Sequence, residues 1–185
     1  MMKTHLDGRW CSNAGSGLRP ALFLWLVIAV AIFLSRPGLA APHQHGESRI
    51  AMAVDGQVLT LELTAPGEDV LGFEHAPKSA AQKNRYRETM ILLQSASDMF
   101  ELDEKAACSP VRTRVLEEIA SIDHDHGEFH IRYEYQCQKP DLLQRMKVLT
   151  FDRFSGMQRV KVIFLRPNGP LQRVLDRDNT IADFR

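Results

Sequence analysis

Cysteine is scarce in this sequence of 185 residues, and neither sign of charge is in excess. There are 3 cysteines, and 23 lysine and arginine side chains balance 23 aspartate and glutamate side chains. Without a basic excess or a cluster of Lys and Arg, we expect no surface for nucleic acid. The sequence also lacks an HExxH motif and a nucleophile elbow, so we expect binding rather than catalysis.

The apolar run at residues 21–34 contains no charged or polar side chain, but it is shorter than the ~20 residues of a membrane-spanning helix. Basic residues precede the run, and the small residues of Pro37–Ala41 follow it. This order is typical of a secretory signal peptide. We therefore predict a signal at residues 1–40, cleaved after Ala40 or Ala41, and export to the periplasm. An uncleaved membrane anchor is the alternative.

Removal of the signal leaves residues 41–185, a length that suits one domain. Cys11 leaves with the signal, so Cys108 and Cys137 remain as a pair. In an oxidising compartment such a pair is expected to form a disulfide. A metal site that uses both thiols is the alternative, although neither cysteine belongs to a CxxC motif.

Two patterns of alternating residues predict strands early and late in this domain. Apolar residues alternate on both sides of Asp55-Gly56, which predicts a β-hairpin. Residues 129–137 alternate in the same way, so Cys137 is expected on the buried face. Between these segments, residues 79–95 contain no Gly or Pro and have apolar residues at helical spacing, which predicts one long helix.

The remaining segments are predicted less uniquely. Residues 111–119 suit a strand or a short helix, whereas residues 148–151 and 160–165 are expected to form strands. A last strand pair between Leu171 and Phe184 is expected to close the sheet. Together these elements predict an α+β domain with a mainly antiparallel sheet, hairpins, one long helix and one or two short helices.

The histidines of the domain are clustered. His43 and His45 form one His-x-His pair, and His124 and His126 form another that is followed by Glu128 and His130. If the strand alternation extends back from Phe129, these later residues share the solvent-facing side. Imidazole nitrogen suits Zn²⁺, Cu²⁺ and Ni²⁺, and nearby acids supply oxygen ligands or hold the second ring nitrogen.

The sequence therefore predicts a metal site built on His124, His126 and His130, with His43, His45 or Glu128 completing the ligand set. A solvated turn with incidental histidines is the alternative. His75 stands alone before Ala76-Pro77, where a histidine more often packs or bonds locally than binds a metal.

The motifs of the chain resemble those of the ZrgA-type zinc-binding periplasmic proteins of Gram-negative bacteria. The resemblance is carried by His43-x-His45-Gly46, the string Gly72–Pro77, Cys108, the His-rich turn and Tyr135-x-Cys137, and it spans the mature chain. It implies a zinc-binding protein that assists zinc uptake or buffering without catalysis. It also makes His75 a candidate ligand, because Glu74 and His75 belong to the shared string.

One departure from the family concerns the long His, Asp and Glu tract that members often carry, which is reduced here to Asp123–Glu128. Low-capacity binding is therefore expected. The expected partners are a divalent metal ion and a zinc ABC transporter or its binding protein, with membrane contact only through the signal before cleavage. The alternative is an envelope protein-interaction module without a metal role.

Overall fold

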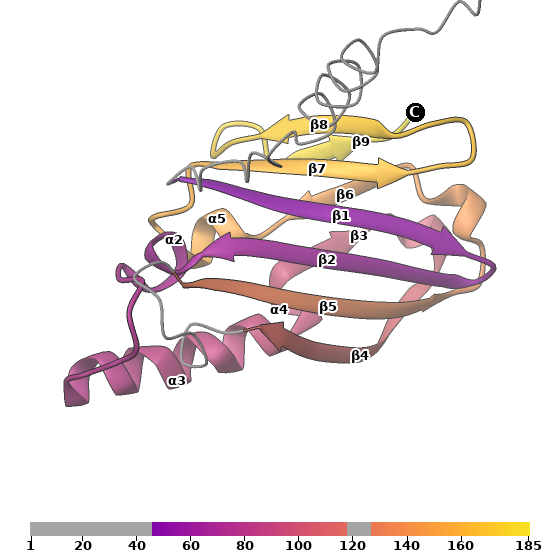
Figure 1. Cartoon of the computed structure of the whole chain (residues 1–185). Helices are drawn as coiled ribbons and strands as arrows, with labels where there is room; N and C mark the ends of the chain where they lie inside the picture. Colours follow the sequence, from indigo (N-terminus) through magenta and orange to yellow (C-terminus); the bar gives the residue numbers. More distant parts are fainter. Residues whose placement is uncertain (1–45, 118–126) are drawn as a thin grey trace, which may run out of the picture. The chain divides into compact units, whose positions relative to one another are not determined.

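The structure is a computed structural model that describes residues 46–117 and 127–185. Within these ranges the chain forms a six-stranded sheet and a three-stranded sheet (Figure 1). In spatial order the large sheet contains β4 (Cys108–Glu117), β5 (Glu128–Cys137), β2 (Val58–Pro66), β1 (Glu47–Asp55), β7 (Arg159–Leu165) and β8 (Leu171–Leu175). The small sheet contains β3 (Phe100–Leu102), β6 (Arg145–Val148) and β9 (Ile181–Asp183).

The helices of the described ranges are short, apart from one. They are α2 (Gly67–Leu71), α3 (Ala80–Gln94), α4 (Ala96–Met99) and α5 (Thr150–Arg153), with 3-10 turns η1 (Glu104–Ala106) and η3 (Pro140–Leu142). The predicted helix at residues 79–95 corresponds to α3, whose N-terminus is closed by a capping box between Ser79 and Gln82. Across residues 46–117 and 127–185, no helix has both the length and the apolar character to cross a membrane.

The predicted α+β class is wrong, because the described part of the chain is mainly β. The second layer over the core is the three-stranded sheet, and α3 is the only described helix of seven or more residues. Only Thr89 and Leu93 of α3 are buried, so this helix covers little of the large sheet. The large sheet is also mixed, since β1 and β7 pair in parallel.

The hairpin predicted around Asp55-Gly56 is confirmed. Strands β1 and β2 pair in register from Arg49 opposite Thr64 to Asp55 opposite Val58. Gly56 in the turn has a φ of 57°, a left-handed conformation that glycine adopts without steric cost. This short connection fixes the register, and therefore places Leu59, Leu61 and Leu63 together on the buried face.

The C-terminal third differs from the prediction in two places. The strand expected at residues 148–151 ends at Val148, because Phe151 and Phe154 are both buried at the three-residue spacing of the short helix α5. The expected last strand pair does not exist as such: β8 joins the large sheet and β9 joins the small sheet. By contrast, residues 108–117 form a strand, and the strand expected at residues 160–165 is β7.

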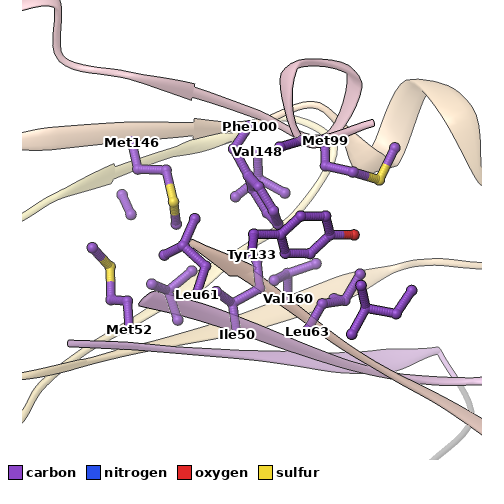
Figure 2. Packing of buried hydrophobic residues seen from close by; sticks show 14 of the residues in the cluster. Ile50, Met52, Leu61, Leu63, Met99, Phe100, Tyr133, Met146, Val148 and Val160 are labelled. Carbon is purple, nitrogen blue, oxygen red and sulfur yellow. The ribbon is translucent and has the colours of Figure 1, made fainter. Parts of the chain in front are cut away.

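The core lies between the two sheets. Figure 2 shows side chains of the large sheet, among them Ile50, Leu61 and Tyr133, close to Phe100 and Val148 of the small sheet. The buried Tyr133 hydroxyl donates a hydrogen bond of 2.6 Å to the Leu93 carbonyl, which ties β5 to α3. Burial raises the pKa of Tyr133 far above its ordinary value, so the hydroxyl remains a donor at physiological pH.

The predicted disulfide between Cys108 and Cys137 is confirmed. The two cysteines lie directly opposite each other, where β4 begins and β5 ends. Cys137 is fully buried, as the strand alternation predicted. Because both sulfurs are consumed in the cross-link, the alternative of a metal site on two thiolates is not supported.

Candidate metal centre

The predicted site residues divide into two groups. Glu128, His130 and His75 belong to the described ranges, whereas His43, His45, His124 and His126 lie outside the described residues. Among residues 46–117 and 127–185, no three His, Cys, Asp or Glu side chains are grouped so that they alone hold a metal ion. The described ranges therefore include only Glu128, His130 and His75 of the predicted ligand set.

Strand β5 presents Glu128 and His130 on its partly exposed face, as its alternation predicted. The intervening residues Phe129 and Ile131 are fully buried, so this strand separates a core face from a polar face. Its two neighbours in the sheet are β4 and β2. Side chains from those strands therefore border His130.

The neighbour that sequence reasoning missed is Glu62 on β2. Its Oε2 lies 3.6 Å from His130 Nε2, and its Oε1 accepts a hydrogen bond of 2.7 Å from Arg132 Nε and lies 2.6 Å from Arg132 Nη2 in an ion pair. Glu62 lies directly opposite Arg132 in the β2–β5 register and diagonally from His130. The alternation of Leu61 and Leu63 indicated a polar face for Glu62, but only the strand pairing identified its partners.

The hydrogen bond from Arg132 is the main reason that the pKa of Glu62 lies below its ordinary value of 4.5. Partial burial opposes this shift, whereas the positive charges of Arg132 and of protonated His130 add to it. Glu62 is thus a carboxylate at neutral pH.

This shift predicts a pH-dependent contribution to stability. A carboxyl group whose pKa is lower in the folded state stabilises the fold above its unfolded pKa, and the contribution is lost as the pH falls through the folded pKa. We expect Glu62→Gln to lower the free energy of unfolding by about 0.5–1 kcal/mol at pH 7, since the pair is partly exposed, and by much less at pH 3. Urea unfolding at both pH values measures the difference. An equal loss at both would contradict the prediction.

His75 lies in the segment between α2 and α3. Its Nδ1 is 2.9 Å from the Ala76 carbonyl oxygen, and its ring stacks on Phe73 with centroids 5.3 Å apart. Because the carbonyl accepts, Nδ1 carries the proton in a neutral ring, and the lone pair is on Nε2. The local packing expected for a lone histidine is present, and it leaves Nε2 as the atom able to bind a metal.

Helix α2 and the loop after it bond to the chain at two distant positions in the sequence. Gly127 donates from its backbone N–H to the Glu74 carbonyl at 3.1 Å and accepts from the Gly67 N–H at 2.8 Å. Gly46 donates from its backbone N–H to Asp69 Oδ1 at 2.7 Å. Residues 46, 127 and 67–74 thus meet at one end of the large sheet, which we call the α2 end (Figure 1).

The side chain of Asp69 holds the start of the described chain at the α2 end. This role was not predicted from the sequence. The Asp69 side chain is buried, with 3% exposure, and Oδ2 lies 3.5 Å from the Ser48 hydroxyl oxygen, which donates to it. A Cβ on Gly156 would lie only 2.7 Å from the Asp69 carbonyl oxygen, so glycine permits the close approach of the segment after α5. The segment after α5 therefore packs closely against Asp69.

Comparison with known protein families identifies the family of this chain. Residues 42–184 match the ZrgA family, whose members are described as zinc uptake proteins. The chain belongs to the ZrgA family. No individual curated protein matches it.

Membership of the ZrgA family confirms the resemblance drawn from the sequence, and the match covers all described residues except Arg185. The ZrgA-like string Gly72–Pro77 lies in the connection from α2 to α3, and its Glu74 carbonyl binds Gly127. In this ZrgA chain the string with the most specific resemblance therefore contacts Gly127, which directly follows His126 in the sequence.

Proposed function

We propose that this protein is an exported zinc-binding accessory protein that acts in the periplasm and assists zinc acquisition or buffers zinc, without catalysing a reaction. Its membership of a family of zinc uptake proteins supports the zinc role. The absence of HExxH and nucleophile-elbow motifs from the sequence favours binding over hydrolysis.

The proposed ligands are His124, His126 and His130, with His43, His45, Glu128 or His75 completing a shell of about four donors around Zn²⁺. Cu²⁺ and Ni²⁺ suit the same imidazole donors. The proposed partner that receives or delivers the ion is a zinc ABC transporter or its binding protein.

The observation that carries this proposal is the meeting of three chain segments at the α2 end. Gly46 directly follows His45 in the sequence, and Gly127 directly follows His126. Both glycines are hydrogen-bonded to residues 67–74, beside His75. The described residues that follow His45 and His126 in the sequence are therefore both held by residues 67–74.

His130 enters the same region from β5. It lies three residues after Gly127, which corresponds to about 10 Å along a strand. Described residues that neighbour the predicted ligands in separate parts of the sequence thus lie within one short region. This favours a shared metal site over incidental histidines in a solvated turn.

Metal titration of the purified, exported protein tests the proposal. Isothermal calorimetry with zinc sulfate is expected to show saturable binding, and thermal unfolding is expected to shift upward in zinc relative to EDTA. At a zinc concentration of 100 times Kd the native state gains about 2.7 kcal/mol. Titrations with copper and nickel salts compare the metals. If the protein shows no binding heat and the same Tm in zinc and EDTA, the zinc function is wrong and the interaction module is favoured.

A further inference from the structure

We propose that Glu62 holds His130 in the tautomer with a proton on Nε2, and that His130 therefore binds zinc through Nδ1. The inference rests on the zinc-binding function proposed above. It adds a positioning residue, Glu62, and assigns the coordinating atom.

The first step is the rigid placement of the Glu62 carboxylate. Arg132 donates from Nε to Oε1, its Nη2 forms an ion pair with the same oxygen, and a guanidinium group cannot act as an acceptor. Because Arg132 holds Oε1, Oε2 is the carboxylate oxygen that meets the neighbouring His130 ring. The distance from Oε2 to His130 Nε2 is 3.6 Å.

The second step is the choice of tautomer. A neutral imidazole has one protonated nitrogen and one nitrogen with a lone pair. A lone pair on Nε2 would face the negative Oε2 and be repelled, whereas an Nε2–H group would be attracted to it. The interaction with a carboxylate therefore favours the proton on Nε2 and the lone pair on Nδ1.

The third step connects the tautomer to the metal. Zinc takes the lone pair of a neutral imidazole, and ligating histidines usually donate their other N–H to a carboxylate or a carbonyl. His130 Nε2 and Glu62 Oε2 face each other at 3.6 Å, so a small shift of either side chain would complete this arrangement. The side chains are about one-third exposed, 32% for His130 and 31% for Glu62, so an ion can reach the ring.

Nitrogen NMR of the metal-free protein, labelled with ¹⁵N-histidine, measures the tautomer directly. At pH 8 we expect the His130 signals of a neutral ring with a protonated Nε2 and an unprotonated Nδ1. The spectrum of His130→Ala assigns these signals. After loading with ¹¹³Cd²⁺ as the probe, we expect a scalar coupling between cadmium and Nδ1.

The Glu62→Gln variant makes a sharper test, because it is expected to reverse the tautomer. Arg132 can only donate, so it retains the amide oxygen of the new side chain and turns its NH₂ group towards His130 Nε2. The donor then favours a lone pair on Nε2 and a proton on Nδ1. We expect zinc affinity to fall by about tenfold or more, as for other losses of a residue that holds a ligand.

The matched control is Glu134→Gln, which removes a carboxylate from the same face of β5 opposite Thr60. It is expected to leave the His130 tautomer and the zinc affinity unchanged. A proton on Nδ1 in the wild-type protein, or cadmium coupling to Nε2, would overturn the inference while leaving the zinc function intact. An unchanged tautomer in Glu62→Gln would also overturn it. Absence of zinc binding in the wild-type protein would remove the proposed function itself.

Discussion

Replacing His124, His126 and His130 together by alanine is expected to weaken zinc binding by at least about 100-fold. Loss of a residue that merely supports a ligand typically costs about 10–100-fold in metal affinity, and loss of several ligands costs no less. His130→Ala alone is expected to cost at least about tenfold. Calorimetric titration of the purified protein with zinc sulfate, compared across these variants, measures both effects.

The control for this series is Gln136→Ala on the exposed face of β5. Gln136 bonds to Gln57 and is opposite Val58, at the far end of β5 from His130. We expect this change to leave the zinc affinity unaltered. If the triple variant binds zinc as tightly as the wild-type protein, the ligands lie elsewhere and the site proposed at the α2 end is wrong.

Removal of the disulfide is expected to lower the stability of the fold and to leave the zinc affinity almost unchanged. The bond between Cys108 and Cys137 closes a loop with a sequence separation of 29 residues. In the chain-entropy account, loss of such a cross-link costs about 3–4 kcal/mol, because the unfolded chain gains freedom. For a domain of this size the Tm should fall by roughly 10 °C. The double variant Cys108→Ala/Cys137→Ala is suitable, since alanine buries no new polar group at position 137.

Zinc affinity of the same variant is expected to change little at a temperature where it is folded. His130 lies seven residues before Cys137 on β5, which is roughly 23 Å along the strand, and the cross-link is at the opposite end of the β4–β5 pair. Wild-type protein reduced with dithiothreitol provides an independent comparison without substitution. A strong loss of zinc affinity in both would show that the cross-link organises the metal site.

The strands were predictable where a local pattern was sufficient. Alternation at Leu59–Leu63 and at residues 129–137 identified β2, β5 and their buried faces, because side-chain direction depends only on the strand itself. The pairing of the cysteines followed from their number and the expected compartment. The fold class was not predictable in this way, because a small second sheet and a parallel β1–β7 pair depend on contacts between distant segments.

In the candidate site, too, local sequence patterns were predictable, whereas contacts between distant segments were not. His130 and Glu128 were predicted as ligands from their spacing, and the family string was recognisable from Gly72–Pro77. Glu62 and Asp69 carried no local signal of their roles. Their roles follow from their positions beside His130 and Gly46, which lie far from them in the sequence.

The sequence by itself determined the family, the disulfide pair and the polar face that presents His130, since each depends on residue identity and short-range spacing. Only the tertiary structure decided that Glu62 borders His130 and that Gly46 and Gly127 meet at the α2 end. The physical reason is register: one strand's alternation sets which way its side chains point, whereas neighbours across strands exist only after the backbones have paired.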